Sequence, residues 1–541
     1  MQRRLNIVRN GEPLPNPAPA DARLGAASLV RYGTAALACL CVAATLLAAV
    51  LHFLELKGDV ALLFHSDTDY LPALYRDLFE QGGRLSQWNL TPAPSFFPDW
   101  PLFFLANWLT GDFFHALPAF FVMQGAMLFA LSLVLGRTAV DDGNGKAAVA
   151  AAWACVLVFC WAMHNIVPYS YFYLSAFHCG AFLLLLLSLR LQQSQDRPAM
   201  LWLLGAMAML AALSDRLYVL QYSLPVVATL ACLHWRRGLP WKKLCAVILL
   251  GSVIGIRLYK AKWLVAHPLQ LPWGMSLHAV PGNLALLADM LAETWRPMPL
   301  GASMLLAYYA VVTVLLPGTL LGRGWRIAHP VVAMLAVFSW FSAAACLAAV
   351  LVSTNVFTVR YFIPAYVLPL VIGPLLLYGL LPQRLHRYLT LLLLAAGVWL
   401  TQSMLVPAAR DIGAVQQAYY PQEVACMDGV IAQYGLRRGM ATYWDAKRIG
   451  MLSRHQPVIA PYTPELEAFH WITSETVFGG AYDFALVRHV EGLDAARLIR
   501  ENGASAARVD CGIFEVLAFP GGGLKRGFVL RPLPLTPPPK K

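Results

Sequence analysis

Eleven stretches of mostly apolar residues follow one another along the chain, and they constrain its fold more than any other feature. A transmembrane helix needs about 20 such residues. Only 13% of the 541 residues are charged and 59% are hydrophobic, whereas soluble proteins are ~25% charged and ~45–50% apolar. The sequence therefore predicts an α-helical polytopic membrane protein with about 11 transmembrane helices, and it excludes a large soluble enzyme. The stretches lie near residues 34–54, 116–136, 147–163, 171–189, 199–213, 217–233, 244–258, 301–321, 328–352, 361–381 and 388–406.

Basic residues in the short turns indicate the orientation. If the N-terminus is cytoplasmic, the cytoplasmic turns carry twelve lysines and arginines. The short opposite turns carry only Arg216 and Arg360. This asymmetry follows the positive-inside rule, so the net charge of +12 reports topology and disfavours nucleic acid as a partner. We expect the protein in a bacterial inner membrane, with the N-terminus cytoplasmic and the chain after the last helix periplasmic.

Composition divides the chain into four parts. Residues 1–31 are polar, basic and proline-rich, which predicts a disordered cytoplasmic tail. A transmembrane domain follows over 32–407 and includes two periplasmic loops, 55–115 and 259–300. Residues 408–530 show short mixed patterns that predict a small periplasmic α/β domain, and 531–541 form a proline-rich tail. Within the α/β domain we expect helices at 421–433 and 493–501 and strands at 440–443, 484–487 and 514–518.

The α/β domain contains only two cysteines, Cys426 and Cys511. In an oxidising periplasm they can form a disulfide, and two buried thiols are the alternative. The other eight cysteines lie in apolar stretches, and none of the ten has the spacing of a zinc site.

Acidic residues gather on the predicted outer face. Between residues 113 and 407 there are only six, of which Asp141, Asp142 and Asp196 lie in cytoplasmic turns. The others are Asp215 in an outer turn, and Asp289 and Glu293 on one face of a helix expected over 284–295. Together with the acidic loop 55–115, they place nearly all candidate chemistry outside.

The segment His65-Ser-Asp-Thr-Asp-Tyr70 directly follows the first helix. In an extended loop, Asp67 and Asp69 can hold a divalent cation such as magnesium or manganese, or one of them can act as a general base. The alternative is capping of the helix that Pro72 permits in its first turn. Further along, Asp99 lies among aromatic residues typical either of a sugar site or of the lipid interface.

Two arginines lie where both topology and the helix dipole disfavour a cation. Arg216, next to Asp215, and Arg360 stand near the outer N-terminal ends of helices. Each therefore requires a compensating anion, which can be a protein carboxylate, a lipid phosphate or a substrate phosphate. For Arg360 we also consider snorkelling to the interface.

This layout resembles that of the GT-C glycosyltransferases, integral membrane enzymes that use polyprenyl-phosphate-linked sugars. The resemblance covers about 34–520: a short N-terminus, one span, a long outer loop that opens with Ser66-Asp67-Thr68-Asp69, many spans, an Arg360-Tyr361-x-x-Pro364 element, and a periplasmic α/β domain. The W-W-D-Y-G-type signature of oligosaccharyltransferases is absent.

The resemblance implies a function and a set of site residues. Asp67 or Asp69 corresponds to the carboxylate that acts as base or metal ligand, and Arg360, with Arg216, to the group that binds the lipid phosphate. Asp215 or Glu293 corresponds to a second acidic site, while Asp99 and Tyr361 are further substrate-binding candidates. The implied reaction transfers a sugar from a polyprenyl-phosphate donor to an envelope glycan, lipid or protein, with no cofactor beyond a divalent cation. A transporter or lipid-glycan flippase and a non-catalytic scaffold or receptor remain alternatives.

Overall fold

The structure is a computed structural model that describes residues 21–140, 145–193, 198–234, 240–261, 267–268, 274–355 and 357–530. Residues 1–20 of the first predicted tail and all of 531–541 lie outside the described residues, as do Asp141, Asp142 and Asp196. The first helix begins at Asp21, within the segment predicted as a tail.

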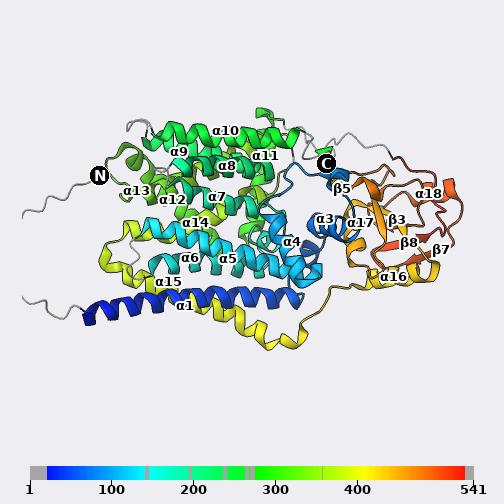
Figure 1. Cartoon of the computed structure of the whole chain (residues 1–541), viewed down its shortest axis with the longest axis horizontal. Coiled ribbons are helices and arrows are strands. Elements are labelled where there is room, and N and C mark those ends of the chain that lie inside the picture. The colour runs from blue at the N-terminus through cyan, green and yellow to red at the C-terminus, as the bar shows by residue number, and fades with distance from the viewer. Residues whose placement is uncertain are drawn as a thin grey trace, which may run out of the picture.

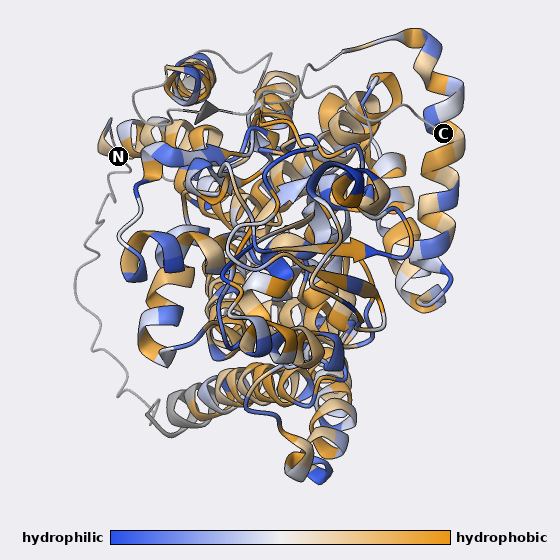
Figure 2. Ribbon diagram, turned by 90° about the vertical axis from the view of Figure 1, so that its right-hand side faces the viewer, coloured by the Kyte–Doolittle hydropathy of each residue, from blue (hydrophilic) through white to orange (hydrophobic). Residues whose placement is uncertain are grey.

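The chain is a polytopic helical membrane protein. Seven described helices are long and apolar enough to cross a bilayer, and they run along the long axis of the molecule (Figure 1). Seen from the end that carries the C-terminal domain, hydrophobic residues predominate along these helices (Figure 2). The seven are α1 (Asp21–Leu54), α5 (Phe113–Ala139), α6 (Lys146–Met163), α12 (Pro299–Leu321), α13 (Pro330–Val352), α14 (Ile363–Leu380) and α15 (Gln383–Arg410).

Four shorter or more charged helices occupy the remaining predicted stretches. They are α7 (Cys179–Gln192), α8 (Pro198–Ser214), α9 (Leu224–His234) and α10 (Pro240–Lys260). The stretch predicted at 171–189 is helical only from Cys179, because Ala176 and His178 adopt the left-handed conformation with φ of 62° and 67°. Residues with a Cβ rarely adopt the left-handed conformation, and a residue in this conformation cannot continue a right-handed helix.

Helices α1 and α15 lie side by side and run in the same direction (Figure 1). The hydroxyl groups of Thr45 and Thr401 are 3.0 Å apart between them. Just beyond their ends, the amide of Gln416 donates to the carbonyl of Leu54 over 2.8 Å. The chain therefore leaves the last long helix on the same side as it leaves the first.

The first outer loop folds into short elements that lie between the long helices and the C-terminal sheet (Figure 1). A small sheet joins this loop to the two other outer segments: β1 pairs in parallel with β2 of the second loop and antiparallel with β5 of the C-terminal domain. The elements are α2 (Val60–Leu63), α3 (Tyr70–Tyr75), β1 (Trp88–Leu90), α4 (Asp99–Thr110), β2 (His267–Pro268), α11 (Val280–Trp295) and β5 (Thr473–Ser474).

The C-terminal domain is a five-stranded mixed sheet in the order β4-β3-β6-β8-β7. Strands β4, β3 and β6 are parallel, and β8 is antiparallel to both β6 and β7. The predicted helices and strands are found within two residues of their expected ends, whereas α17, β4 and β7 were not predicted. The elements are α16 (Gln422–Tyr434), β3 (Arg438–Thr442), α17 (Tyr443–Leu452), β4 (Val458–Tyr462), β6 (Phe484–Arg488), α18 (Ala495–Asn502), β7 (Ala507–Asp510) and β8 (Phe514–Ala518).

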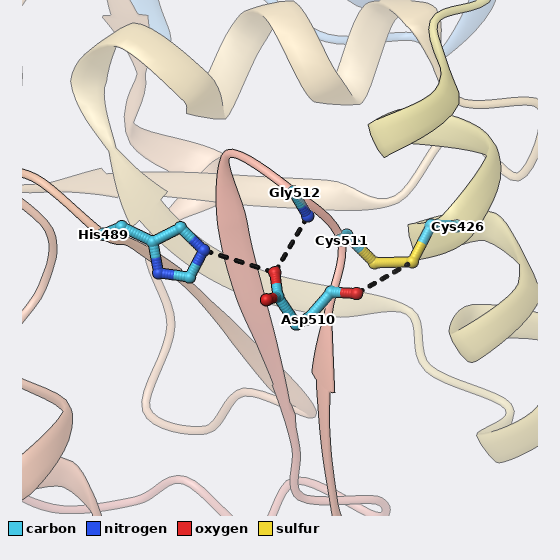
Figure 3. The surroundings of a disulfide bond; sticks show 5 residues. All are labelled: Cys426, His489, Asp510, Cys511 and Gly512. Atoms are coloured by element: carbon cyan, nitrogen blue, oxygen red, sulfur yellow. Dashed lines mark hydrogen bonds and ion pairs between the residues drawn. A yellow bond between two sulfur atoms is a disulfide. The ribbon is translucent and has the colours of Figure 1, made fainter.

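A disulfide joins α16 to the end of β7. Cys426 and Cys511 are bonded, which confirms the predicted pair (Figure 3). Next to it, the Oδ1 atom of Asp510 accepts hydrogen bonds from the Gly512 amide, over 2.9 Å, and from His489 Nε2, over 3.2 Å. A disulfide agrees with a location outside the reducing cytoplasm.

Candidate functional site

The acidic segment after α1 forms a tight turn between α2 and α3. The Nδ1 atom of His65 accepts from the amide of Asp67 over 3.1 Å, and the Thr68 hydroxyl donates to the carbonyl of His65 over 2.7 Å. Asp69 occupies the N-cap position of α3, but its side chain makes no capping hydrogen bond. The segment is thus neither an extended strand nor an ordinary helix cap.

The C-terminal domain contacts this turn directly. The hydroxyl of Tyr443 donates a hydrogen bond to Oδ1 of Asp67, and the hydroxyl of Ser66 donates to the carbonyl of Tyr443. A bidentate pair holds α17 in place, because Arg488 Nε and Nη2 donate to the two carboxylate oxygens of Asp445 over 2.7 and 3.0 Å. The domain therefore fixes one oxygen of Asp67.

These contacts lie at the carboxyl edge of the parallel strands. The chain passes from β3 through α17 to β4 on one side, and later returns as β6 on the other side of β3. In open α/β sheets, the crevice at such a switch in strand order is the usual position of a ligand. Here Tyr443 follows the end of β3, and it meets the first outer loop.

Asp69 is a buried carboxyl group in an unusual environment. It is 1% exposed, and neither of its oxygens has a hydrogen-bond partner among the described residues. Burial raises the pKa of Asp69 to about 7, and the positive charges of Arg448 and Lys447 oppose this rise. Burial also lowers the pKa of Lys447 to about 8, against the effect of Asp67 and Asp69.

Residues 176–178 also line the site, and two carboxylates hold them. Asp99 accepts from the amide of Ala176 over 3.0 Å, and Asp215 Oδ2 lies 2.5 Å from Nδ1 of His178. Asp99 is 2% exposed, and burial raises its pKa to about 7, helped by the charge of Asp215. The left-handed conformation at Ala176 and His178 is therefore stabilised by side chains, as is common at ligand sites.

A cavity brings the two main predicted residues together. Asp67 and Arg360 both line this cavity, whose volume is about 50 Å³. The guanidinium carbon of Arg360 lies 5.5 Å from the centre of the Phe177 ring. Its Nε is buried and has no hydrogen-bond partner among the residues that the structure describes. Tyr70, Thr91, Ala93, Ala176, Phe177, His178, Trp471 and Ile472 complete the lining, and we call this space the Asp67–Arg360 cavity.

Three predicted residues lie elsewhere. Arg216 packs over the ring of Tyr259, with 4.6 Å between its guanidinium carbon and the ring centre. Glu293 is exposed on α11, together with Asp289. Tyr361 does not line the cavity but packs against the ring of His178 at 5.8 Å.

The described ranges contain no group of three or more His, Cys, Asp or Glu residues that could hold a metal ion. Around Asp67 and Asp69, the positive charge that acts on both carboxylates comes from Lys447. A magnesium or manganese ion bound by these two residues therefore stays a prediction from the sequence.

Comparison with known proteins adds no assignment, since no protein-family model and no curated protein matches the chain. The site thus rests on its geometry. Sequence reasoning missed Tyr443, Lys447 and His178, which lie far from Asp67 in the chain. The sequence signals for them are weak: a charged helix in a small domain, and a histidine after an aromatic run.

Proposed function

We propose that this protein is a glycosyltransferase of the bacterial inner membrane that transfers a sugar from a polyprenyl-phosphate donor to a cell-envelope acceptor on the periplasmic face. The observation that carries this proposal is the cavity that Asp67 and Arg360 line together. A carboxylate and a guanidinium with a free donor are the groups that such a transfer needs for the acceptor hydroxyl and the leaving phosphate.

The fold supports a topology of eleven spans with the site outside. A helix occupies all or part of each of the eleven predicted stretches, although four of these helices are shorter or more charged than the rest. The first outer loop and the C-terminal domain touch through Asp67 and Tyr443, so they lie on the same side of the membrane. The disulfide favours the periplasm as that side.

In the proposed reaction, Asp67 acts as the general base. Tyr443 holds its Oδ1, which leaves Oδ2 for the hydroxyl of the acceptor. The carboxylate takes the hydroxyl proton, the oxygen attacks the anomeric carbon of the sugar, and the bond to polyprenyl phosphate breaks. Arg360 stabilises the charge that grows on the leaving phosphate, and a poorly hydrated cavity strengthens this effect.

His178 takes a supporting role in this proposal, and Asp69 takes no direct part. Asp215 fixes the orientation of the His178 ring, and His178 and Arg360 both line the cavity. Asp69 does not line the cavity, so we assign the base to Asp67 alone.

The test is mass spectrometry of envelope glycans and lipids from a strain that lacks the protein, complemented with variants. We expect Asp67→Asn and Arg360→Gln to lower transfer at least 100-fold, the usual range for a general base or a charge-stabilising group. Matched controls are Glu80→Gln and Arg296→Gln, which change exposed residues of the outer face. All four proteins must reach the membrane in equal amounts.

Three results would count against the proposal. Full transfer by the Asp67→Asn and Arg360→Gln variants would remove the chemistry from this cavity. Loss of the glycan from the deletion strain, with its glycolipid precursor retained on the cytoplasmic face, would favour the flippase or transporter instead. A deletion strain whose envelope glycans and lipids are all unchanged would favour a scaffold or receptor.

A further inference from the structure

A second and larger cavity lies between the first outer loop and the C-terminal domain. Its volume is about 450 Å³, within the range of ~300–1,000 Å³ that is usual for small-molecule sites. Residues of α3, of the following turns and of β1 line one side. Residues of α17, of β4 and of 472–477 line the other. We call this space the loop–domain cavity.

The charged groups of the loop–domain cavity are mostly positive. Arg76, Arg438 and Lys447 line it, against Asp77 as the carboxylate. Asp77 is already engaged, because its Oδ2 accepts from the indole nitrogen of Trp88 over 2.6 Å. An anion in this cavity would therefore meet three cations and one carboxylate, of which one oxygen is held by the indole of Trp88.

The three cations are held in place by neutral partners. Arg76 Nη1 donates to the carbonyl of Gly450 over 3.0 Å, and Arg438 Nη2 donates to that of Val477 over 2.9 Å. Lys447 Nζ donates to the carbonyl of Ile472 over 2.7 Å. Carbonyl groups fix the side chains without neutralising them. The carboxylates whose charge acts on these cations are Asp67 and Asp69 at Lys447, and Glu80 and Asp69 at Arg76. Positioned cations of this kind recognise carboxylates and phosphates.

The loop–domain cavity adjoins the proposed catalytic site. Ile472 lines both cavities, and the charge of Lys447 acts on Asp67. The hydroxyl-bearing residues Thr473 and Thr476 also line the larger cavity. A ligand bound there thus meets side chains that can hydrogen-bond hydroxyl groups, and it lies beside the base.

We propose that the loop–domain cavity binds a saccharide that carries a carboxylate or a phosphate group. That the ligand is a saccharide rests on the proposed function. That it carries an acidic group rests on the charges of the cavity. The C-terminal domain is thus assigned the recognition of an acidic sugar next to Asp67.

The experiment measures binding to the full chain, purified in detergent, by saturation-transfer NMR titration. The probes are glucuronate for the carboxylate, glucose 1-phosphate for the phosphate, and glucose as the neutral match. We expect at least one acidic sugar to bind at least 10-fold more tightly than glucose, and Arg438→Gln to remove this preference. Arg437→Gln is the control, because Arg437 is the neighbouring residue, is exposed and does not line the cavity.

The outcomes separate this inference from the proposed function. Equal binding of glucose and both acidic sugars, or an equal loss in the Arg437→Gln and Arg438→Gln variants, would overturn the inference. Transfer that still depends on Asp67 would then leave the glycosyltransferase proposal standing. Conversely, a preference for acidic sugar that Arg438→Gln abolishes supports the inference, even if the deletion strain shows no loss of a transferred sugar.

Discussion

Asp69 allows a quantitative test of the outer-face site, because its burial predicts both the sign and the size of an effect. Its pKa rises from the ordinary 3.8 to about 7. A rise of this size corresponds to roughly 4 kcal/mol, at 1.36 kcal/mol per unit. Since the folded state holds the proton more tightly than the unfolded state, stability falls as pH rises from about 4 to about 7. Above that range the whole penalty applies.

Asp69→Asn removes the charge and keeps the size of the side chain. At pH 8 we expect the variant to be more stable than the wild type by up to about 4 kcal/mol, less about 1–3 kcal/mol for a buried amide without partners. At pH 5 the gain should shrink to less than half of its value at pH 8, because the wild-type carboxyl group is then protonated in the folded state. Other groups that titrate in this range, Asp99 among them, contribute equally to the stability of the variant and of the wild type, so their contributions cancel in the comparison.

The assay is thermal unfolding of the full chain in detergent at pH 5 to 8. We expect the unfolding temperature of Asp69→Asn, relative to wild type, to rise with pH. A variant less stable than the wild type by the same amount at every pH would refute the reasoning. It would mean that Asp69 is ionised throughout and stabilised by Lys447.

Three further predictions address other parts of the structure. Replacing Cys426 and Cys511 by Ser should cost about 4–5 kcal/mol, because the bond closes a loop with a sequence separation of 85; an unchanged denaturation midpoint in urea would contradict this. Tyr443→Phe should lower sugar transfer about 10- to 100-fold without loss of folded protein, since a hydrogen bond to a charged group contributes ~1.5–3 kcal/mol; transfer at the wild-type rate would exclude the role assigned to this hydroxyl. Gly180→Ala should lower stability by about 1–3 kcal/mol in a detergent-stability assay, because a Cβ there would lie 1.9 Å from a carboxylate oxygen at the start of α4, which would have to shift. Gly397→Ala, which meets nothing within 4 Å inside α15, is the control and should be at least as stable as the wild type.

The helical part of the fold was readable from the sequence because a bilayer imposes length and composition on each span. The error at 171–189 has a local cause. Residues 171–174 are apolar enough to extend a predicted helix, but the backbone turns at Ala176 and His178. The carboxylates of Asp99 and Asp215 accept hydrogen bonds from this turn and stabilise it, and these residues lie in other segments of the chain. A pattern within one segment carries no signal of such partners.

The residues of the candidate site were likewise predictable only in part. Asp67 and Arg360 stand out in the sequence because each is a charge at a place where a membrane protein has few. Tyr443 and Lys447 belong to α17, a short helix with mixed polarity that the sequence did not predict. Only the docking of the C-terminal domain gives them a role, through contacts across more than 370 positions of the chain.

The way the domain docks explains why a membrane enzyme of this layout would carry it. A switch in strand order leaves a crevice at the carboxyl edge of a parallel sheet, and this crevice usually accepts a small molecule. Here the first outer loop meets that edge, so that Tyr443 reaches Asp67 and Trp471 reaches the Asp67–Arg360 cavity. The remaining space between loop and domain is the loop–domain cavity, lined by cations from both. The spans supply Arg360, the loop supplies the proposed base, and the domain supplies the hydroxyl that hydrogen-bonds to it, so none of the three parts contains the proposed site alone.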